Sequence, residues 1–222
     1  KSDGGTWVLS GASTYTGATT INAGFLGTPA LSVGPTSGAF GAGTLTFAGG
    51  GLLALNAGGL TVNNPIQFNN NVQNTVAGTA VNFVGTGATP ISLASGNNWT
   101  INNVTSGGVT FSGAINSTDG TARDFSLAGP GSYTYNTPIL SATGAGLVRT
   151  VVNTTGSVTF NNSAAANINS QGILINQGSV ILNAVNPFAN GLATNNTLIN
   201  IAGGELKSTS STPLTSANAC LL

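Results

Sequence analysis

Short segments in which apolar residues alternate with Thr, Ser or Asn run along this chain, and they constrain its fold more than any other feature. Thr44-Leu45-Thr46-Phe47 is one of them, and Gly, Asn, Ser or Pro bounds most of the others. Alternation with a period of two is typical of a β-strand that buries one face. No segment sustains the apolar period of about 3.6 residues that marks an amphipathic helix. Because good helix formers are also scarce, the sequence predicts an all-β protein.

The segments with the clearest alternation are predicted to be strands. They cover residues 6–9, 44–47, 52–55, 80–84, 99–102, 109–111, 125–127, 147–152, 158–160, 173–176, 180–183 and 198–201. Because alternate residues of a strand point to opposite faces, we expect Leu45, Phe47, Leu198 and Ile201 to be buried. Thr46 is expected to face water.

Two similar units flank a more irregular middle of the chain. The units lie near residues 5–52 and 173–206, where Ile21-Asn22-Ala23-Gly24 corresponds to Ile175-Asn176-Gln177-Gly178. Repeats too short to bury their own apolar face gain a core by stacking on their neighbours. We therefore expect residues 1–222 to form a single β-solenoid domain. With about twenty residues per coil, the solenoid would have about ten coils.

Residues 5–26 read GTWVLSGASTYTGATTINAGFL. This stretch resembles the autotransporter-associated β-strand repeat of bacterial surface passengers, which runs Gly-Thr-Leu-Thr-Leu-Ser-Gly-x-Asn-Thr-Tyr-Thr-Gly-Gly-Thr-Thr-Ile-x-Ala-Gly-x-Leu. Trp7, Ser13 and Ala18 are among the residues that depart from that pattern. The resemblance implies a right-handed parallel β-helix displayed outside a bacterial cell. It also implies a stalk or scaffold rather than catalytic machinery.

Charged residues make up only 4% of the 222 residues, and the net charge is zero. An average soluble domain has about 25% charged residues, so this surface must consist mainly of hydroxyls, amides and glycine. Without a basic patch, nucleic acid is not expected as a partner. The sequence also has no run of about eighteen apolar residues, so we expect no membrane insertion of this segment.

The residues that most enzymes use are few. The chain has no His, and its carboxylates are Asp3, Asp119, Asp124 and Glu205, while Cys220 is the only cysteine. Glycosidases need two facing carboxylates, and nucleophilic catalysis needs a base. Zinc sites need several thiolates or imidazoles. We therefore expect a protein that is not an enzyme and that holds no metal or other cofactor.

Three local features leave alternatives open. The charged loop at residues 119–124 is predicted to be a solvated turn with a local Arg–carboxylate pair, and a small carbohydrate or ion contact is the alternative. Five aromatic residues are either core residues or a platform for sugar stacking; they are Trp7, Tyr15, Trp99, Tyr133 and Tyr135. Four asparagines are either turn residues or rungs of amide ladders between coils; they are Asn64, Asn70, Asn98 and Asn103.

Three function classes remain. The first is a non-catalytic, structural or adhesive scaffold at the cell surface or outside the cell, with surface or matrix components as partners. The second is a self-associating subunit of a filament, sheath or surface layer. A carbohydrate-binding or carbohydrate-active β-helix is the third.

Half of the charges lie near the chain ends, where a solenoid exposes unpaired strand edges. Lys1 and Asp3 lie near one end, and Glu205 and Lys207 lie near the other. These four residues are the candidate assembly ends. Lys1 would pair with Glu205, and Asp3 with Lys207, in a head-to-tail contact that propagates. The alternative is that these charges discourage stacking.

Overall fold

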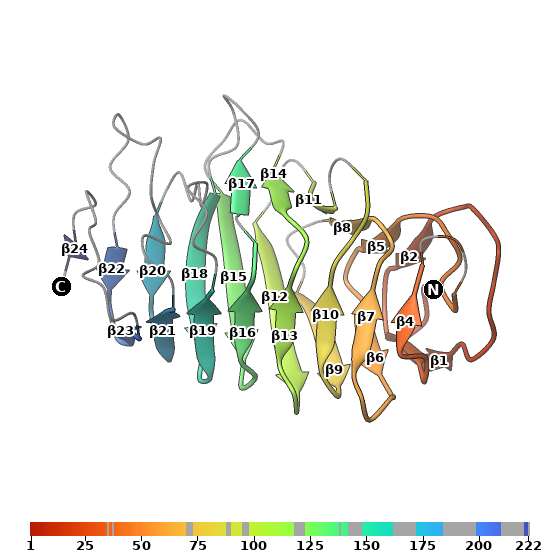
Figure 1. The fold of residues 1–222 in the computed structure, drawn as a ribbon, viewed down its shortest axis with the longest axis horizontal. Coiled ribbons are helices and arrows are strands. Elements are labelled where there is room, and N and C mark those ends of the chain that lie inside the picture. The colour runs from red at the N-terminus through yellow and green to blue at the C-terminus, as the bar shows by residue number, and fades with distance from the viewer. Residues whose placement is uncertain are drawn as a thin grey trace.

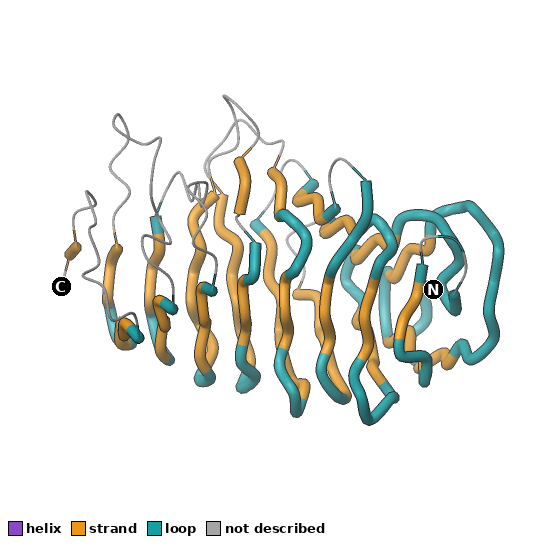
Figure 2. Tube along the Cα trace, viewed as in Figure 1, coloured by secondary structure: helices purple, strands orange, loops and turns teal. Residues whose placement is uncertain are grey.

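The computed structural model describes residues 1–34, 36, 38–69, 73–87, 90–94, 98–117, 123–137, 139–141, 148–161, 172–183, 199–209 and 220–221. Within these ranges the chain forms strands and loops and contains no helix (Figure 2). All named strand pairs are parallel, and they form three sheets of ten, eight and six strands, called sheets A, B and C. The fold is a β-solenoid, as the sequence predicts.

Each sheet takes one strand from successive coils. Sheet A consists, in spatial order, of β1 (Thr6–Val8), β3 (Phe25–Thr28), β6 (Gly51–Ala54), β9 (Gln73–Gly78), β12 (Trp99–Thr105), β15 (Arg123–Gly129), β18 (Val148–Thr154), β20 (Ile173–Ile175), β22 (Ile199–Ile201) and β24 (Cys220–Leu221). Sheet B consists of β4 (Ser32–Val33), β7 (Leu60–Val62), β10 (Val81–Phe83), β13 (Val109–Phe111), β16 (Tyr133–Tyr135), β19 (Ser157–Phe160), β21 (Ser179–Leu182) and β23 (Glu205–Ser208). Sheet C consists of β2 (Thr19–Ile21), β5 (Leu45–Phe47), β8 (Ile66–Phe68), β11 (Ile91–Leu93), β14 (Ile115–Ser117) and β17 (Ile139–Ser141). The strands stack along the long axis, with β1 and β24 at opposite ends (Figure 1).

The number of coils differs from the sequence prediction. About six turns contribute a strand to each of the three sheets, rather than about ten. One reason is coil length: stacked residues such as Gly129 and Thr154 lie 25 positions apart in sequence, more than the twenty assumed. The other is that β1 and β20 to β24 lie in turns without a described strand in sheet C.

The interior contains one continuous apolar core. Most strands of sheets B and C follow a buried, half-buried, buried pattern, as in β13 and β14. Leu45 and Phe47 are fully buried, which confirms their predicted inward direction. The prediction for Thr46 is wrong, because its exposed fraction is only 6%. Thr20 and Gln67 pair with it from the two neighbouring strands and flank it on the outer face.

The predicted burial also fails at the last described coils. Ile201 is only partly buried. Strand β24 pairs with Ile199 and Asn200 and leaves Ile201 without a covering partner in that pairing. Leu198, the other residue predicted to be buried there, lies outside the described residues. An apolar residue in the correct register is therefore buried only where another coil stacks on it.

Aromatic rings stack on one another through this core. Phe111 and Tyr135 have ring centroids 4.9 Å apart, and Tyr135 and Phe160 are also 4.9 Å apart. Phe83 continues the stack 5.8 Å from Phe111. Ring pairs at such distances stabilise a core beyond the apolar area that they bury. Trp99, Tyr133 and Tyr135 are fully buried, so the interpretation of these three as part of a surface sugar platform is wrong.

Two neighbouring buried tyrosines differ in their hydrogen bonds. The Tyr133 hydroxyl donates to Ile101 O and lies at hydrogen-bond distance from Ala128 O, both at 2.7 Å. The Tyr135 hydroxyl has no partner among the described residues. Burial raises the pKa of both hydroxyls far above the ordinary tyrosine value, so both stay neutral.

We expect Tyr135→Phe to leave the free energy of unfolding unchanged or to raise it by about 1 kcal/mol, because it removes an unpaired buried hydroxyl. Tyr133→Phe should lower it by about 1 to 2 kcal/mol, because it removes a hydroxyl that is hydrogen-bonded. Urea denaturation of both variants checks the pair. Equal effects would contradict the assigned hydrogen bonds.

An amide ladder exists, and its described members are other residues than the asparagines considered in the sequence. Asn161 donates to Asn136 and Asn183 donates to Asn161, each at 3.0 Å, and the Thr209 hydroxyl continues the ladder to Asn183 at 2.6 Å. Each of these residues directly follows a strand of sheet B. The predicted residues serve other purposes: Asn64 and Asn103 are buried and bond to backbone groups, Asn98 accepts from Asp124 N, and Asn70 is outside the described residues.

Candidate functional site at the ends of the solenoid

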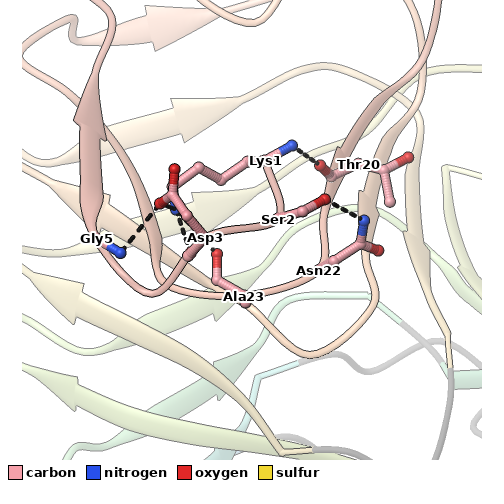
Figure 3. Close-up of polar contacts among 7 residues, drawn as sticks. All are labelled: Lys1, Ser2, Asp3, Gly5, Thr20, Asn22 and Ala23. Carbon is pink, nitrogen blue, oxygen red and sulfur yellow. Dashed lines mark hydrogen bonds and ion pairs between the residues drawn. The ribbon is translucent and has the colours of Figure 1, made fainter.

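The first residues of the chain lie against the free edge of sheet C. Strand β2 is the terminal strand of that sheet. The Lys1 backbone nitrogen donates to Thr20 O at 2.9 Å, and Asn22 N donates to Lys1 O at 2.8 Å (Figure 3). Asn22 also donates from its side chain to Ser2 Oγ at 3.1 Å. This segment satisfies backbone groups that an edge strand would otherwise expose.

The side chain of Lys1 turns back onto its own segment. Its Nζ contacts the Asp3 carboxylate and donates to Ala23 O at 3.2 Å, and it lies 5.6 Å from the centroid of the Trp7 ring (Figure 3). Only 2% of the Lys1 side chain is exposed, against 54% of Asp3. The hydrogen bond from Lys1 is the main cause that lowers the pKa of the Asp3 carboxyl. This carboxylate therefore stays ionised and orders the segment by also accepting from Gly5 N at 3.0 Å.

Gly24 forms the turn beneath this segment. Its φ is +63°, and a Cβ at this position would lie 2.2 Å from Gly5 O and 2.7 Å from Lys1 Nζ. Glycine is the residue that tolerates both the left-handed conformation and the close approach. The Ile-Asn-Ala-Gly run seen in the sequence is thus the platform on which residues 1–5 rest. The sequence analysis did not assign Thr20, Asn22 or Ala23 to this end. The repeated Ile-Asn-Ala-Gly run was the sequence feature that could have indicated them.

The charges at the other end are paired in the same way. Glu205 and Lys207 lie on β23, the terminal strand of sheet B, and form an ion pair with each other. Their side chains are 55% and 53% exposed, so this pair contributes little to stability. Residues two apart on a strand share a face, which brings the two side chains together.

The four candidate assembly residues therefore form two pairs, each within its own end. Lys1 and Asp3 lie beside sheet C, whereas Glu205 and Lys207 lie on sheet B. A coaxial stack that continued each sheet would not bring Lys1 next to Glu205. Head-to-tail self-association stays a prediction, and any such contact would first have to exchange the existing partners.

The charged loop has a defined partner in the next coil. Arg149 on β18 donates from Nε and Nη2 to the two carboxylate oxygens of Asp124 on β15, at 2.8 and 2.9 Å. The hydrogen bond with Asp124 raises the pKa of Arg149. Asp119 lies outside the described residues. Within the described part of the chain, no group of three His, Cys, Asp or Glu residues is placed to hold a metal ion.

Apolar side chains are exposed at the end formed by β1. Trp7 is 52% and Val8 53% exposed on β1 itself, whereas Tyr15, which is 41% exposed, lies after β1. Trp7 pairs in register with the buried Leu26, so it occupies a core position that no coil covers. Phe25 N donates to Gly5 O and Leu9 N donates to Gly27 O. Because a parallel strand alternates its bonding directions, the backbone groups of Thr6 and Val8 point to the open edge.

The stacked parallel sheets, the continuous core and the paired ends define a β-solenoid repeat protein. Residues 1–26 match the family model described as Passenger-associated-transport-repeat. This match covers the segment beside β2, strands β1 and β2, and the first two residues of β3. Together with the β-solenoid, it is consistent with an autotransporter passenger-like repeat protein. No curated protein and no solved structure matches the chain.

The family match suggests a secreted or surface-exposed domain. The described residues contain no helix that is long and apolar enough to cross a membrane.

Proposed function

We propose that this chain is a non-catalytic structural segment of a bacterial surface passenger, displayed outside the cell as a β-solenoid scaffold. The continuous core carries this proposal. Buried side chains extend from Ile21 in β2 to Ile199 in β22 without a break in the described coils. Such a stack is a rigid spacer, because each coil is held by its two neighbours.

The ionic groups support a structural role. Lys1 pairs with Asp3, Arg149 with Asp124, and Lys207 with Glu205. A general acid or base must be able to exchange a proton with the substrate, and each of these three carboxylates is instead engaged by a cation of the same chain. We therefore propose that the chain catalyses no reaction. Assays with pectin, alginate, xylan and peptides should give no turnover, and turnover that Asp124→Asn abolishes would overturn this part of the proposal.

Surface display is testable on the native host. An antibody raised against the purified chain should label intact cells as strongly as permeabilised cells. Protease added outside should remove that label while a cytoplasmic marker survives. Labelling that requires permeabilisation would refute display outside the cell.

A filament subunit is the second candidate, and the uncovered β1 edge favours it. Trp7 occupies a core position that no further coil covers. The backbone groups of Thr6 and Val8 beside it point to the open edge of sheet A. Electron microscopy of the purified chain separates the two candidates, because a scaffold gives discrete short rods and a filament subunit gives fibres. In the filament case, Trp7→Lys should abolish the fibres, whereas Tyr15→Lys should preserve them, since Tyr15 is exposed outside β1.

A further inference from the structure

The coil that contains residues 1–8, here called the first coil, places a lysine where the next coils place apolar core residues. The Lys1 backbone donates to Thr20 O and accepts from Asn22 N. In a parallel pair this pattern makes Lys1 the register neighbour of Ile21. Ile21 pairs in turn with Phe47, and both are fully buried. Lys1 therefore stands at the end of a column of core residues, and its side chain points inward.

Trp7 is the other inward residue of the first coil. It continues a second core column, in which Leu26 and Leu52 are buried. The Lys1 ammonium lies 5.6 Å from the centroid of the Trp7 ring, an attractive contact between a cation and an aromatic face. Because only 2% of the Lys1 side chain is exposed, its stem covers apolar surface at the end of the core.

The Lys1 ammonium has partners in the same two coils. It contacts the Asp3 carboxylate and donates to Ala23 O at 3.2 Å (Figure 3). The Asp3 side chain is 54% exposed, so water solvates this ion pair from one side. A further coil stacked on this end would remove that water. Desolvating an ion pair costs more than the attraction between its charges returns, unless new polar partners replace the water.

The open edge of β1 acts in the opposite direction. The backbone groups of Thr6 and Val8 point to that edge, and free N–H and C=O groups invite a further strand. The net gain from each such hydrogen bond is small compared with the cost of desolvating an ion. Inward-pointing charges are one of the devices by which natural proteins protect sheet edges. The balance therefore opposes a further coil.

The charges on β23, near the other end, point the other way. Glu205 and Lys207 flank Leu206, which pairs with the buried Val180 and packs against the core. Because neighbouring residues of a strand face opposite sides, the two charged side chains point outward. Their ion pair can stay in water when a coil stacks beside it. The two ends thus differ in where their charges point.

We infer that residues 1–8 form a cap, in which the Lys1–Asp3 pair stops a coil of a second copy of this chain from stacking on the first coil. The cap keeps the apolar columns of two copies apart. This inference does not depend on display outside the cell. It favours the scaffold over the filament, because end-to-end growth would need this end.

Sedimentation velocity of the 222-residue chain over a range of concentrations tests the cap. The parent should be monomeric. The cap variant, Lys1→Leu with Asp3→Asn, extends an apolar column to the end of the solenoid and removes both charges. It should associate end to end and reach about twice the parent mass or more, since two copies then share a contact.

The matched control is Lys207→Leu with Glu205→Gln. It removes the ion pair of β23 and, like the cap variant, leaves the net charge at zero. It should sediment like the parent, because its charges point outward. If the cap variant loses its β circular dichroism signal, Lys1→Met replaces it with the same expectation.

Self-association of the parent would overturn the inference, and fibres of the parent would in addition support the filament candidate. A cap variant that stays monomeric, or that associates no more than the control, would overturn it as well. Cells that are labelled only after permeabilisation would contradict display outside the cell and would leave the cap unaffected.

Discussion

Phe111→Ala is expected to lower the free energy of unfolding by about 3 to 5 kcal/mol, the range for removing a fully buried aromatic side chain. Phe111 has no exposed surface and lies at the centre of the aromatic stack. Its ring centroid is 4.9 Å from that of Tyr135, 5.8 Å from Phe83 and 6.1 Å from Phe125. The flanking coils are fixed by sheet hydrogen bonds, so they cannot collapse into the space that the ring leaves.

The neighbouring residue provides the control for this experiment. Thr110 is on the same strand but faces outward and is half-buried, so Thr110→Ala should change the stability by about 0.5 kcal/mol at most. Urea denaturation followed by circular dichroism measures both variants. Similar midpoints for the two would show that Phe111 is not a centre of the core.

The fold class follows from the sequence because strand alternation is a local property. Each of the twelve predicted strand segments overlaps a strand of the structure, as β13 at residues 109–111 illustrates. The missed strands include most of sheet C, such as β8 (Ile66–Phe68) and β14 (Ile115–Ser117). A segment of three residues contains a single alternation, so the pattern identifies some of them, such as residues 109–111, and misses others. The coil length escaped for the same reason, since these unseen strands lengthen each turn.

The sequence shows the two similar runs but not the corner of the solenoid at which each of them lies. Gly24 and Gly178 end the two similar runs, and both have a positive φ. Gly24 lies at the corner from sheet C to sheet A, whereas Gly178 lies at the corner from sheet A to sheet B. Two runs that share three of their four residues thus end in a positive-φ glycine at different corners of the solenoid. Local sequence determines the turn, and the register of the whole stack determines where the turn falls.

The sequence indicated charges near both termini, but not the contacts that these charges make within one chain. Charges near both termini indicated Lys1, Asp3, Glu205 and Lys207, but the prediction paired them between molecules. In the structure, Lys1 contacts Asp3, and Lys207 contacts Glu205. A pair two residues apart forms at almost no entropic cost from loop closure, whereas a pair between molecules must also offset the loss of translational freedom.

Asn103 shows what a polar residue does when the stack encloses it, and it leads to the second large prediction. The residue is fully buried and lies in β12, close to the corner at which that strand ends. Its amide nitrogen donates to Ser132 O at 2.7 Å in the next coil. Its Oδ1 accepts from Thr105 N at 2.9 Å and from Thr105 Oγ1 at 2.8 Å.

Gly131 makes room for this amide. A Cβ on Gly131 would lie 2.5 Å from the Asn103 side chain, and Gly131 N donates to Asn103 O at 3.0 Å. The amide therefore connects two coils through a corner that no larger residue would fit. This arrangement does not follow from the sequence, in which Asn103 is one of many similar asparagines beside turn residues.

We expect Asn103→Ala to lower the free energy of unfolding by about 3 kcal/mol, because each buried group left without a partner costs about 1 to 3 kcal/mol. Thr105 loses the acceptor for both its N–H and its hydroxyl, and because Asn103 and Thr105 are both buried, water is a poor replacement for that acceptor. Asn161→Ala is the matched control, since Asn161 makes ladder bonds on the exposed surface where water replaces them. Its cost should be about 1 kcal/mol or less. Urea denaturation of the two alanine variants measures the difference, and an Asn103 effect no larger than that of Asn161 would mean that the corner does not depend on this amide.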